Sequence, residues 1–139
     1  MILRTPDERT ALLARSKTVA VVGASPKEDR PSYDVFSYLR AHGYDAVPIN
    51  PAIAELQGVK AYPSLAAYAA DRGAPDVVDV FRKPDDLMPI VDEAIAAGAR
   101  AIWFQLGVVN DAAIARADAA GLDVVVDLCM KTEHRARVS

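Results

Sequence analysis

Five short apolar runs, separated by segments of helical pattern, constrain the fold of this chain more than any other feature of its sequence. The runs are residues 18–22, 46–49, 76–81, 101–104 and 122–126. The first is continuously apolar, as expected of a parallel strand that is covered on both faces. Because crossovers between parallel strands are right-handed, few topologies suit this alternation. We therefore predict an α/β, Rossmann-like, doubly wound five-stranded parallel sheet with the strand order 3-2-1-4-5.

Capping signals mark where the helices begin. Thr5, Pro6 and Glu8 have the spacing of a capping box, which predicts a helix ending near Arg15. Three further helices are expected to begin at polar caps: Ser32, Ser64 and Asn110. Pro48 is unusual within the second strand, because proline donates no hydrogen bond to a ladder and favours strand edges or ends.

Length and composition predict one globular domain. The 139 residues suit a single domain, 1–139, with an N-terminal helix in 1–16 and a core in 17–135. The net charge of −3 argues against a broad nucleic-acid-binding face. No apolar run approaches the ~20 residues that span a bilayer. With one cysteine there is no internal disulfide, so we expect a cytoplasmic protein that binds neither nucleic acid nor membrane, its protein partner unknown.

The loop after the first strand is the strongest candidate for a ligand site. In open parallel sheets, ligands bind beyond the carboxyl ends of the strands, where the strand order reverses. The loop begins Gly23-Ala24-Ser25-Pro26, in which Gly23 permits a sharp turn. Ala24 and Ser25 add little bulk, so main-chain N–H groups could approach an anion. This pattern predicts a phosphate-binding turn.

Charge and helix position support the same interpretation. Ser32 is expected to start a helix whose positive end faces the loop, and Lys27 and Arg30 supply formal charge. In the alternative interpretation, Gly23 merely ends a strand and both cations are solvated.

Residues that are missing from this loop argue against some classes of nucleotide ligand. A dinucleotide site needs G-x-G-x-x-G and, about 20 residues later, an acid for the ribose. Residues 23–30 contain one glycine, and the second strand ends in Asn50-Pro51. The phosphate-binding loop of NTPases, G-x-x-x-x-G-K-[ST], is also absent. These departures disfavour NAD, and ATP hydrolysis more strongly.

A series of motifs follows the predicted strand ends along the chain. They are Val22-Gly23-Ala24-Ser25-Pro26-Lys27 with Asp29-Arg30-Pro31-Ser32, Pro48-Ile49-Asn50-Pro51, Tyr62-Pro63-Ser64-Leu65, Val77-Val78-Asp79-Val80-Phe81-Arg82, Trp103-Phe104-Gln105-Leu106-Gly107-Val108 and Asp127-Leu128-Cys129-Met130-Lys131. Together these motifs resemble the CoA-binding protein family, small stand-alone relatives of the CoA-binding domain of the succinyl-CoA synthetase α subunit. The resemblance covers roughly residues 15–135.

The resemblance implies a cofactor, coenzyme A or an acyl-CoA, and a set of residues that would bind it. Around the CoA phosphates it places Gly23, Ala24, Ser25 and Arg30, with Ser32 at the helix start beside them. Pro26 and Lys27 of the same loop complete this part of the predicted site. By the adenosine and its 3′-phosphate it places Asn50 and Pro51. Flanking the ligand are Val80, Phe81 and Arg82, and towards the pantetheine are Gln105, Leu106 and Gly107. Arg82 has an alternative role as a surface partner of Asp85 or Asp86.

No residue carries a clear catalytic signal. Cys129 is the single candidate nucleophile, but a lone cysteine is more often a small buried hydrophobe. Two separated histidines do not make a zinc site; we expect His42 to assist a helix C-terminus and His134 to lie on the surface. For Asp79 we expect a structural role.

Three hypotheses follow for the function. The first is a non-catalytic CoA or acyl-CoA binding module that acts as a carrier, sensor or regulatory subunit. The second is an enzyme, either an NAD(P)-linked oxidoreductase or a partner-dependent subunit of an acyl-CoA ligase. The third is a domain that kept the fold and lost its ligand. Catalysis by the chain alone is left open.

Overall fold

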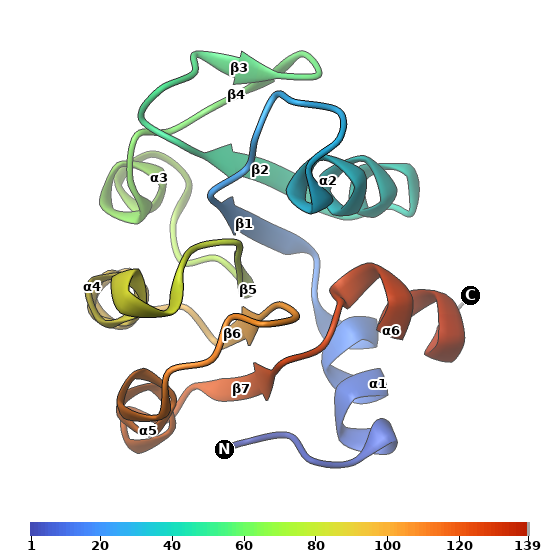
Figure 1. The fold of residues 1–139 in the computed structure, drawn as a ribbon, viewed down its shortest axis with the longest axis vertical. Helices are drawn as coiled ribbons and strands as arrows, with labels where there is room; N and C mark the ends of the chain where they lie inside the picture. The colour runs from blue at the N-terminus through green and yellow to red at the C-terminus, as the bar shows by residue number, and fades with distance from the viewer. Residues whose placement is uncertain (139) are drawn as a thin grey trace.

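A five-stranded parallel sheet forms the centre of the computed structural model, which describes residues 1–138 (Figure 1). The strand order is β2-β1-β5-β6-β7. The strands are β1 (Thr18–Val22), β2 (Asp45–Ile49), β5 (Val77–Val80), β6 (Ala101–Phe104) and β7 (Asp123–Val126). The predicted class, an α/β Rossmann-like doubly wound parallel sheet, is confirmed.

The predicted strand order is wrong. Counted along these five strands the order is 2-1-3-4-5, not 3-2-1-4-5, because β5 pairs with β1 and leaves β2 at the edge. Both orders satisfy right-handed crossovers, so handedness could not separate them. Pro48 could have done so: it lacks an N–H for a further strand, which suits an edge. Within residues 1–138, the outer side of β2 pairs with no further strand of the sheet and carries an isolated bridge between Ile49 and Tyr62.

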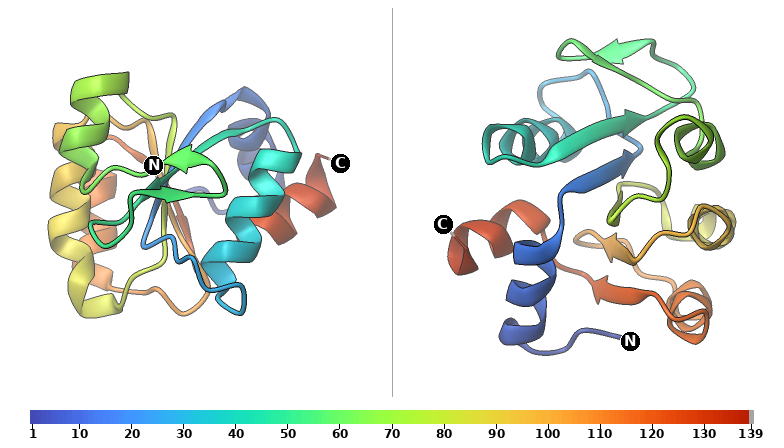
Figure 2. Two further views of the ribbon diagram at one scale, coloured as in Figure 1. Left: turned by 90° about the horizontal axis from the view of Figure 1, so that it is seen from above. Right: turned by 180° about the vertical axis from the view of Figure 1, so that it is seen from behind.

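Helices cover both faces of the sheet (Figures 1 and 2). One face is covered by α3 (Leu65–Arg72), α4 (Leu87–Ala96) and α5 (Asp111–Ala119). The other is covered by α1 (Pro6–Arg15), α2 (Pro31–Ala41) and α6 (Met130–Arg137). Successive strand residues point to opposite faces, so Ala20 joins the first core cluster and Val21 the second. Because β1 packs against an apolar cluster on each face of the sheet, its residues from Val19 to Val22 are all apolar.

Most of the predicted helix caps are present. Thr5 and Glu8 form the capping box of α1, and Ser64 and Asn110 cap α3 and α5 with their side chains. The prediction that Ser32 caps α2 is wrong, because Arg30 is the N-cap and Ser32 lies buried in the first turn. The Ser32 hydroxyl instead accepts a hydrogen bond from Ser25 N in the preceding loop.

Three elements were not predicted. A hairpin of β3 (Glu55–Leu56) and β4 (Val59–Lys60) turns at Gln57-Gly58, where both residues have positive φ. A short 3-10 helix, η1 (Pro84–Asp86), precedes α4. Helix α6 is polar apart from Met130 and Ala136, so its sequence gives little apolar periodicity. Within residues 1–138, no helix has the length and apolarity to cross a membrane.

Candidate functional site

Two cavities lie at the carboxyl ends of the strands. The first, with a volume of about 650 Å³, receives residues from the loops after β1, β5 and β6 and from the start of α2. The second, of about 490 Å³, receives residues from the ends of β1, β2 and β5 and from α4. Both are lined by Gly23, Phe81, Arg82 and Asp86. Their common wall therefore stands where β1 and β5 are neighbours and the strand order reverses, the position at which such sheets bind ligands.

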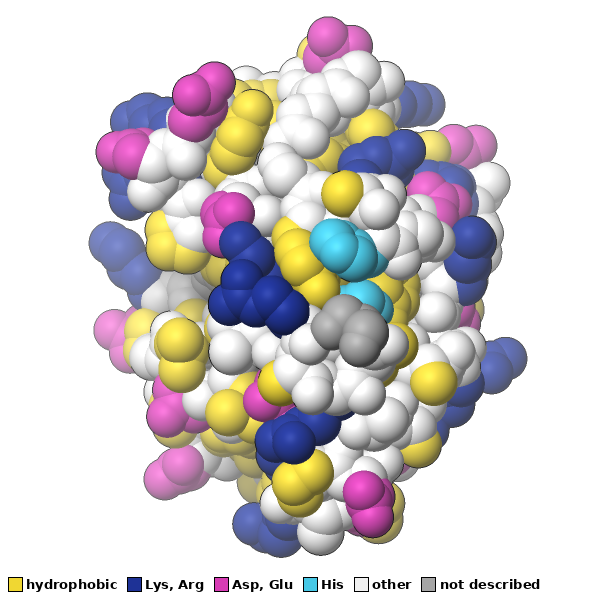
Figure 3. All heavy atoms as spheres, turned by 90° about the vertical axis from the view of Figure 1, so that its right-hand side faces the viewer, with side chains coloured by type: hydrophobic (Ala, Val, Ile, Leu, Met, Phe, Trp, Pro, Cys, Tyr) yellow, Lys and Arg dark blue, Asp and Glu magenta, His cyan; other side chains and the backbone are white. Residues whose placement is uncertain are grey.

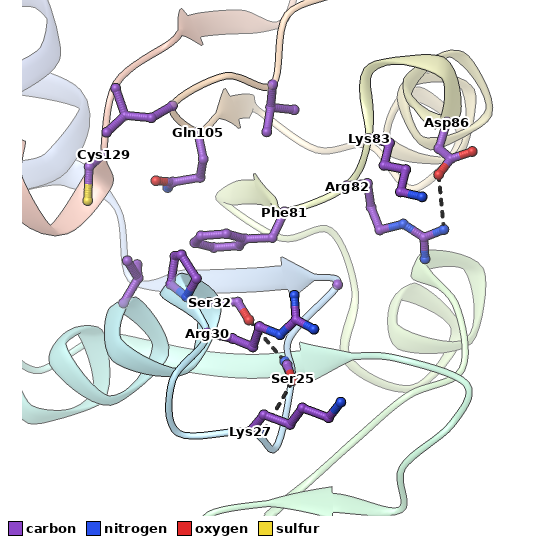
Figure 4. A pocket seen from close by; sticks show the side chains of 15 residues that line it. Ser25, Lys27, Arg30, Ser32, Phe81, Arg82, Lys83, Asp86, Gln105 and Cys129 are labelled. Atoms are coloured by element: carbon purple, nitrogen blue, oxygen red, sulfur yellow. Dashed lines mark hydrogen bonds and ion pairs between the residues drawn. The ribbon is translucent and has the colours of Figure 1, made fainter.

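The structure brings most of the predicted site residues together (Figure 4). Those that line the first cavity are Gly23, Ser25, Lys27, Arg30, Ser32, Phe81, Arg82, Gln105 and Leu106. Asn50 and Pro51 line the second. Four others line neither cavity: Ala24 and Val80 are buried, and Pro26 and Gly107 are exposed.

Some lining residues were not predicted. Pro31 and Val35 of α2, Val108 and Asp86 also face the first cavity. The three apolar residues, Pro31, Val35 and Val108, carry no sequence signal that distinguishes a cavity wall from the core. Lys83, a cation in the loop after β5, lines the cavity as well.

Gly23 allows two loops to touch. Its φ is +84°, and a Cβ built on it would lie 2.3 Å from the carbonyl oxygen of Phe81. The main chain ties neighbouring strands at this point: Phe81 N donates to Val22 O (2.9 Å) and Gly23 N to Ile49 O (3.1 Å). The common wall of the cavities thus requires a residue without a side chain.

Side chains hold the loop after β1 in place. Ser25 N donates to Ser32 Oγ, and Lys27 N donates to Ser25 Oγ, each at 3.1 Å. Asn50 Nδ2 donates to Ala24 O (2.8 Å). In this structure the N–H groups of Ser25 and Lys27 are therefore bonded to serine hydroxyls, and the approach of main-chain N–H groups to an anion stays a prediction. Around the first cavity, cationic side chains and the N-terminus of α2 remain available.

Four cations surround the first cavity: Lys27, Arg30, Arg82 and Lys83. Arg82 also pairs with Asp86, Nη2 to Oδ2 at 3.2 Å, and both side chains are about half exposed. Asp86 is thus the partner in the alternative role considered for Arg82. An exposed pair of this kind contributes little to stability and can be exchanged for a stronger anion.

Asp79 is the one buried acid beneath the cavity. Gln105 Nε2 donates to its Oδ1, and Oδ2 is the one buried side-chain oxygen or nitrogen without a partner among the described residues. Burial raises the pKa of Asp79 to about 7, although the hydrogen bond from Gln105 opposes this.

Cys129 is half-buried and lines the first cavity, at the residue before α6. No histidine lines either cavity. The prediction that His134 lies on the surface is wrong: it is buried, and its Nδ1 is 2.8 Å from Tyr38 Oη. His42 assists a helix end as expected, with Nδ1 bonded to Tyr38 O. Within 1–138 no cluster of His, Cys, Asp and Glu could hold a metal ion.

Comparison with known proteins identifies relatives along almost the whole chain. The family described as "CoA binding domain" matches residues 17–135. The uncharacterized protein YneT of Bacillus subtilis is 39% identical over 123 residues, covering 88% of this chain and 89% of its own length.

Solved structures agree in fold. A hypothetical protein from Pyrococcus horikoshii is 40% identical with a TM-score of 0.92, over 98% of this chain and 94% of its own. The dinucleotide-forming acetyl-coenzyme A synthetase 1 of Candidatus Korarchaeum cryptofilum is 25% identical with a TM-score of 0.65. That alignment covers 78% of this chain but 25% of the synthetase, so the similarity concerns one part of a much larger protein.

Proposed function

Because the chain belongs to the CoA-binding domain family, we propose that it binds coenzyme A or an acyl-CoA as a non-catalytic carrier, sensor or regulatory module. The observation that carries this proposal is the placement of the two cavities. They meet at the point of strand reversal, and the first is surrounded by four cations in a chain whose net charge is −3.

The charges suit the phosphates of the ligand. CoA is a polyanion, and cation–phosphate hydrogen bonds are among the stronger ones, since arginine can make them bidentately. In the proposal, Arg30 and Lys27 bind phosphate beside the N-terminus of α2, and Arg82 leaves Asp86 to join them. The helix end adds its own positive potential.

The remaining walls suit the two ends of the ligand. Asn50 and Pro51 line the second cavity, which is proposed to take the adenosine and its 3′-phosphate. Gln105, Leu106 and the apolar residues of the first cavity would contact the pantetheine arm. Leu106 is 66% exposed at the rim of that cavity, where a bound arm would cover it.

Asn50 argues against NAD. Both ends of its side chain are used within the protein: Nδ2 donates to Ala24 O, and Oδ1 accepts from Ala52 N at 2.8 Å. It therefore fixes the loop and offers no carboxylate to a ribose, which an NAD site places at this point.

The non-catalytic role is supported by the lining chemistry. Cys129 contributes a thiol to the first cavity, but neither cavity places an imidazole beside it. A nucleophile with an oriented base is the usual requirement for covalent catalysis.

Calorimetric titration of the whole chain with CoA, acetyl-CoA and NAD tests the proposal. We expect binding of CoA, and a loss of at least about 10-fold in affinity for Arg30→Glu/Arg82→Glu, because charge-assisted hydrogen bonds are lost. The matched control, Arg4→Glu/Arg100→Glu, makes the same charge change at exposed arginines that line neither cavity. Absence of heat at millimolar CoA, or tighter binding of NAD, would overturn the proposal.

A further inference from the structure

Asp79 lies one row below the floor of the first cavity. In the sheet register Asp79 pairs with Val21 on one side and Trp103 on the other. Side chains two residues apart on a strand share a face. The next row on this face is therefore Gly23, Phe81 and Gln105, all of which line the cavity.

Asp79 contacts the cavity through Gln105. The Gln105 side chain is buried and donates Nε2–H to Asp79 Oδ1. One of the two N–H groups of this amide is bonded to Asp79, which leaves the second N–H and the carbonyl Oε1, and Oε1 is the acceptor of the two. Figure 4 shows the Gln105 side chain between those of Cys129 and Phe81, which also line the cavity.

We propose that Gln105 Oε1 is a hydrogen-bond-acceptor subsite for a secondary amide N–H of the ligand arm, and that Asp79 is the residue that positions it. This inference rests on the proposed function and extends it to the pantetheine arm, which carries secondary amides between short apolar segments. The surrounding wall matches that chemistry, because Val35, Phe81 and Val108 are apolar and Gln105 adds one polar group.

Asp79 is costly as a purely structural residue. It is fully buried in a row otherwise formed by Val21 and Trp103, and its Oδ2 has no partner. A carboxyl in such surroundings lowers stability relative to an apolar side chain of similar size. Its one side-chain hydrogen bond goes to Gln105, so the contribution that remains is the orientation of that amide.

The test compares ligands with and without the arm. Wild type, Gln105→Met and Asp79→Val are titrated with CoA and with adenosine 3′,5′-bisphosphate, which has phosphates but no arm. Both variants should bind CoA about 3- to 10-fold more weakly, the effect of one neutral hydrogen bond. Their affinity for the bisphosphate should change by less than about 2-fold. Gln57→Met, which alters the other glutamine of the chain outside both cavities, should change neither affinity.

Asp79→Asn separates positioning from packing. Asparagine keeps an acceptor for Gln105 Nε2, so this variant should bind CoA more tightly than Asp79→Val does. Asp79→Val should also unfold at a higher urea concentration than wild type while it binds CoA more weakly, a combination that a purely structural role would not produce. If Asp79→Val does not fold, Gln105→Met and Asp79→Asn carry the test.

Three results would overturn the inference. Gln105→Met could bind CoA as tightly as wild type, which excludes the subsite. It could lose both ligands equally, which indicates general damage to the cavity. Wild type could bind the bisphosphate and CoA equally well, which excludes any contact with the arm. If wild type binds neither ligand, the proposed function itself fails, and this result is distinct from the other three.

Discussion

A Cβ on Gly23 would lie 2.3 Å from the carbonyl oxygen of Phe81, a separation that no side chain can accept without movement of one of the two loops. Gly23 follows β1 and Phe81 follows β5, so the contact joins the ends of the neighbouring strands between which the chain order reverses. The same two residues line both cavities. Their close approach sets the shape of the site.

Gly23→Ala is therefore expected to lower the free energy of unfolding by at least about 2 kcal/mol, through backbone strain at positive φ and displacement of Phe81. Gly43→Ala is the matched control, because Gly43 has a φ of +89° but nothing within 4 Å of its Cβ position. Urea denaturation of both variants measures the difference. Equal losses would show that the contact with Phe81 adds nothing to the strain.

In the proposed mode of binding, Asp86 competes with the ligand phosphate for Arg82. Asp86→Asn removes that ion pair and one negative charge from the common wall of the cavities. We expect CoA to bind about 2- to 5-fold more tightly, the range of an exposed ion pair. Asp92→Asn breaks a similar exposed pair with Arg116 outside the cavities and serves as the control. Calorimetry at low salt measures both, and weaker binding by Asp86→Asn would contradict the competition.

Asp79 makes the stability of the fold depend on pH. Burial raises its pKa from 3.8 to about 7, so the folded state keeps a proton that the unfolded chain has lost. The resulting penalty is absent below about pH 4, grows by at most about 1.4 kcal/mol per pH unit, and is complete above about pH 7. Asp79→Asn should therefore gain stability over wild type at pH 8 and little at pH 4. Urea denaturation at several pH values measures this, and a pH-independent difference would contradict it.

His134 imposes the opposite dependence. Burial, together with the nearby His42, lowers the pKa of His134; the two rings are 5.5 Å apart and lie on the face shown in Figure 3. Stability from the neutral ring is complete above about pH 6.5 and is lost as the pH falls through the lowered pKa. His134→Gln should cost about 1 kcal/mol at pH 8 through the weakened contact with Tyr38.

The same variant should lose less stability than wild type between pH 7 and pH 5. His42→Gln removes the neighbouring ring that adds to the lowering of the His134 pKa, so it should reduce the acid loss to a smaller extent than His134→Gln does. Thermal unfolding at each pH measures both variants. A steeper acid loss in His134→Gln than in wild type would exclude the buried ring as the cause.

Local signals in the sequence predicted local structure well. The run from Thr18 to Val22 predicted β1, and Thr5, Ser64 and Asn110 cap helices as their types and positions indicate. These features depend on a few neighbouring residues, whose side chains satisfy free N–H groups of the same segment. The prediction that Ser32 caps a helix was wrong because its hydrogen-bond partner, Ser25 N, belongs to the preceding loop.

Apolar runs and helix caps act over short distances, so the amino-acid sequence was enough to predict a parallel sheet covered on both faces and the strand-end loops from which the site is built. Tertiary structure alone decided that β5 lies beside β1, that Asp86 holds Arg82, and that Gln105 bends down to Asp79. Each of these depends on which segments become neighbours in space, and the right-handed crossover rule permits more than one answer. The contact of Gly23 with Phe81 depends on both the sequence and the tertiary structure. The glycine permits it because it has no side chain, and the strand order brings the Phe81 carbonyl beside it.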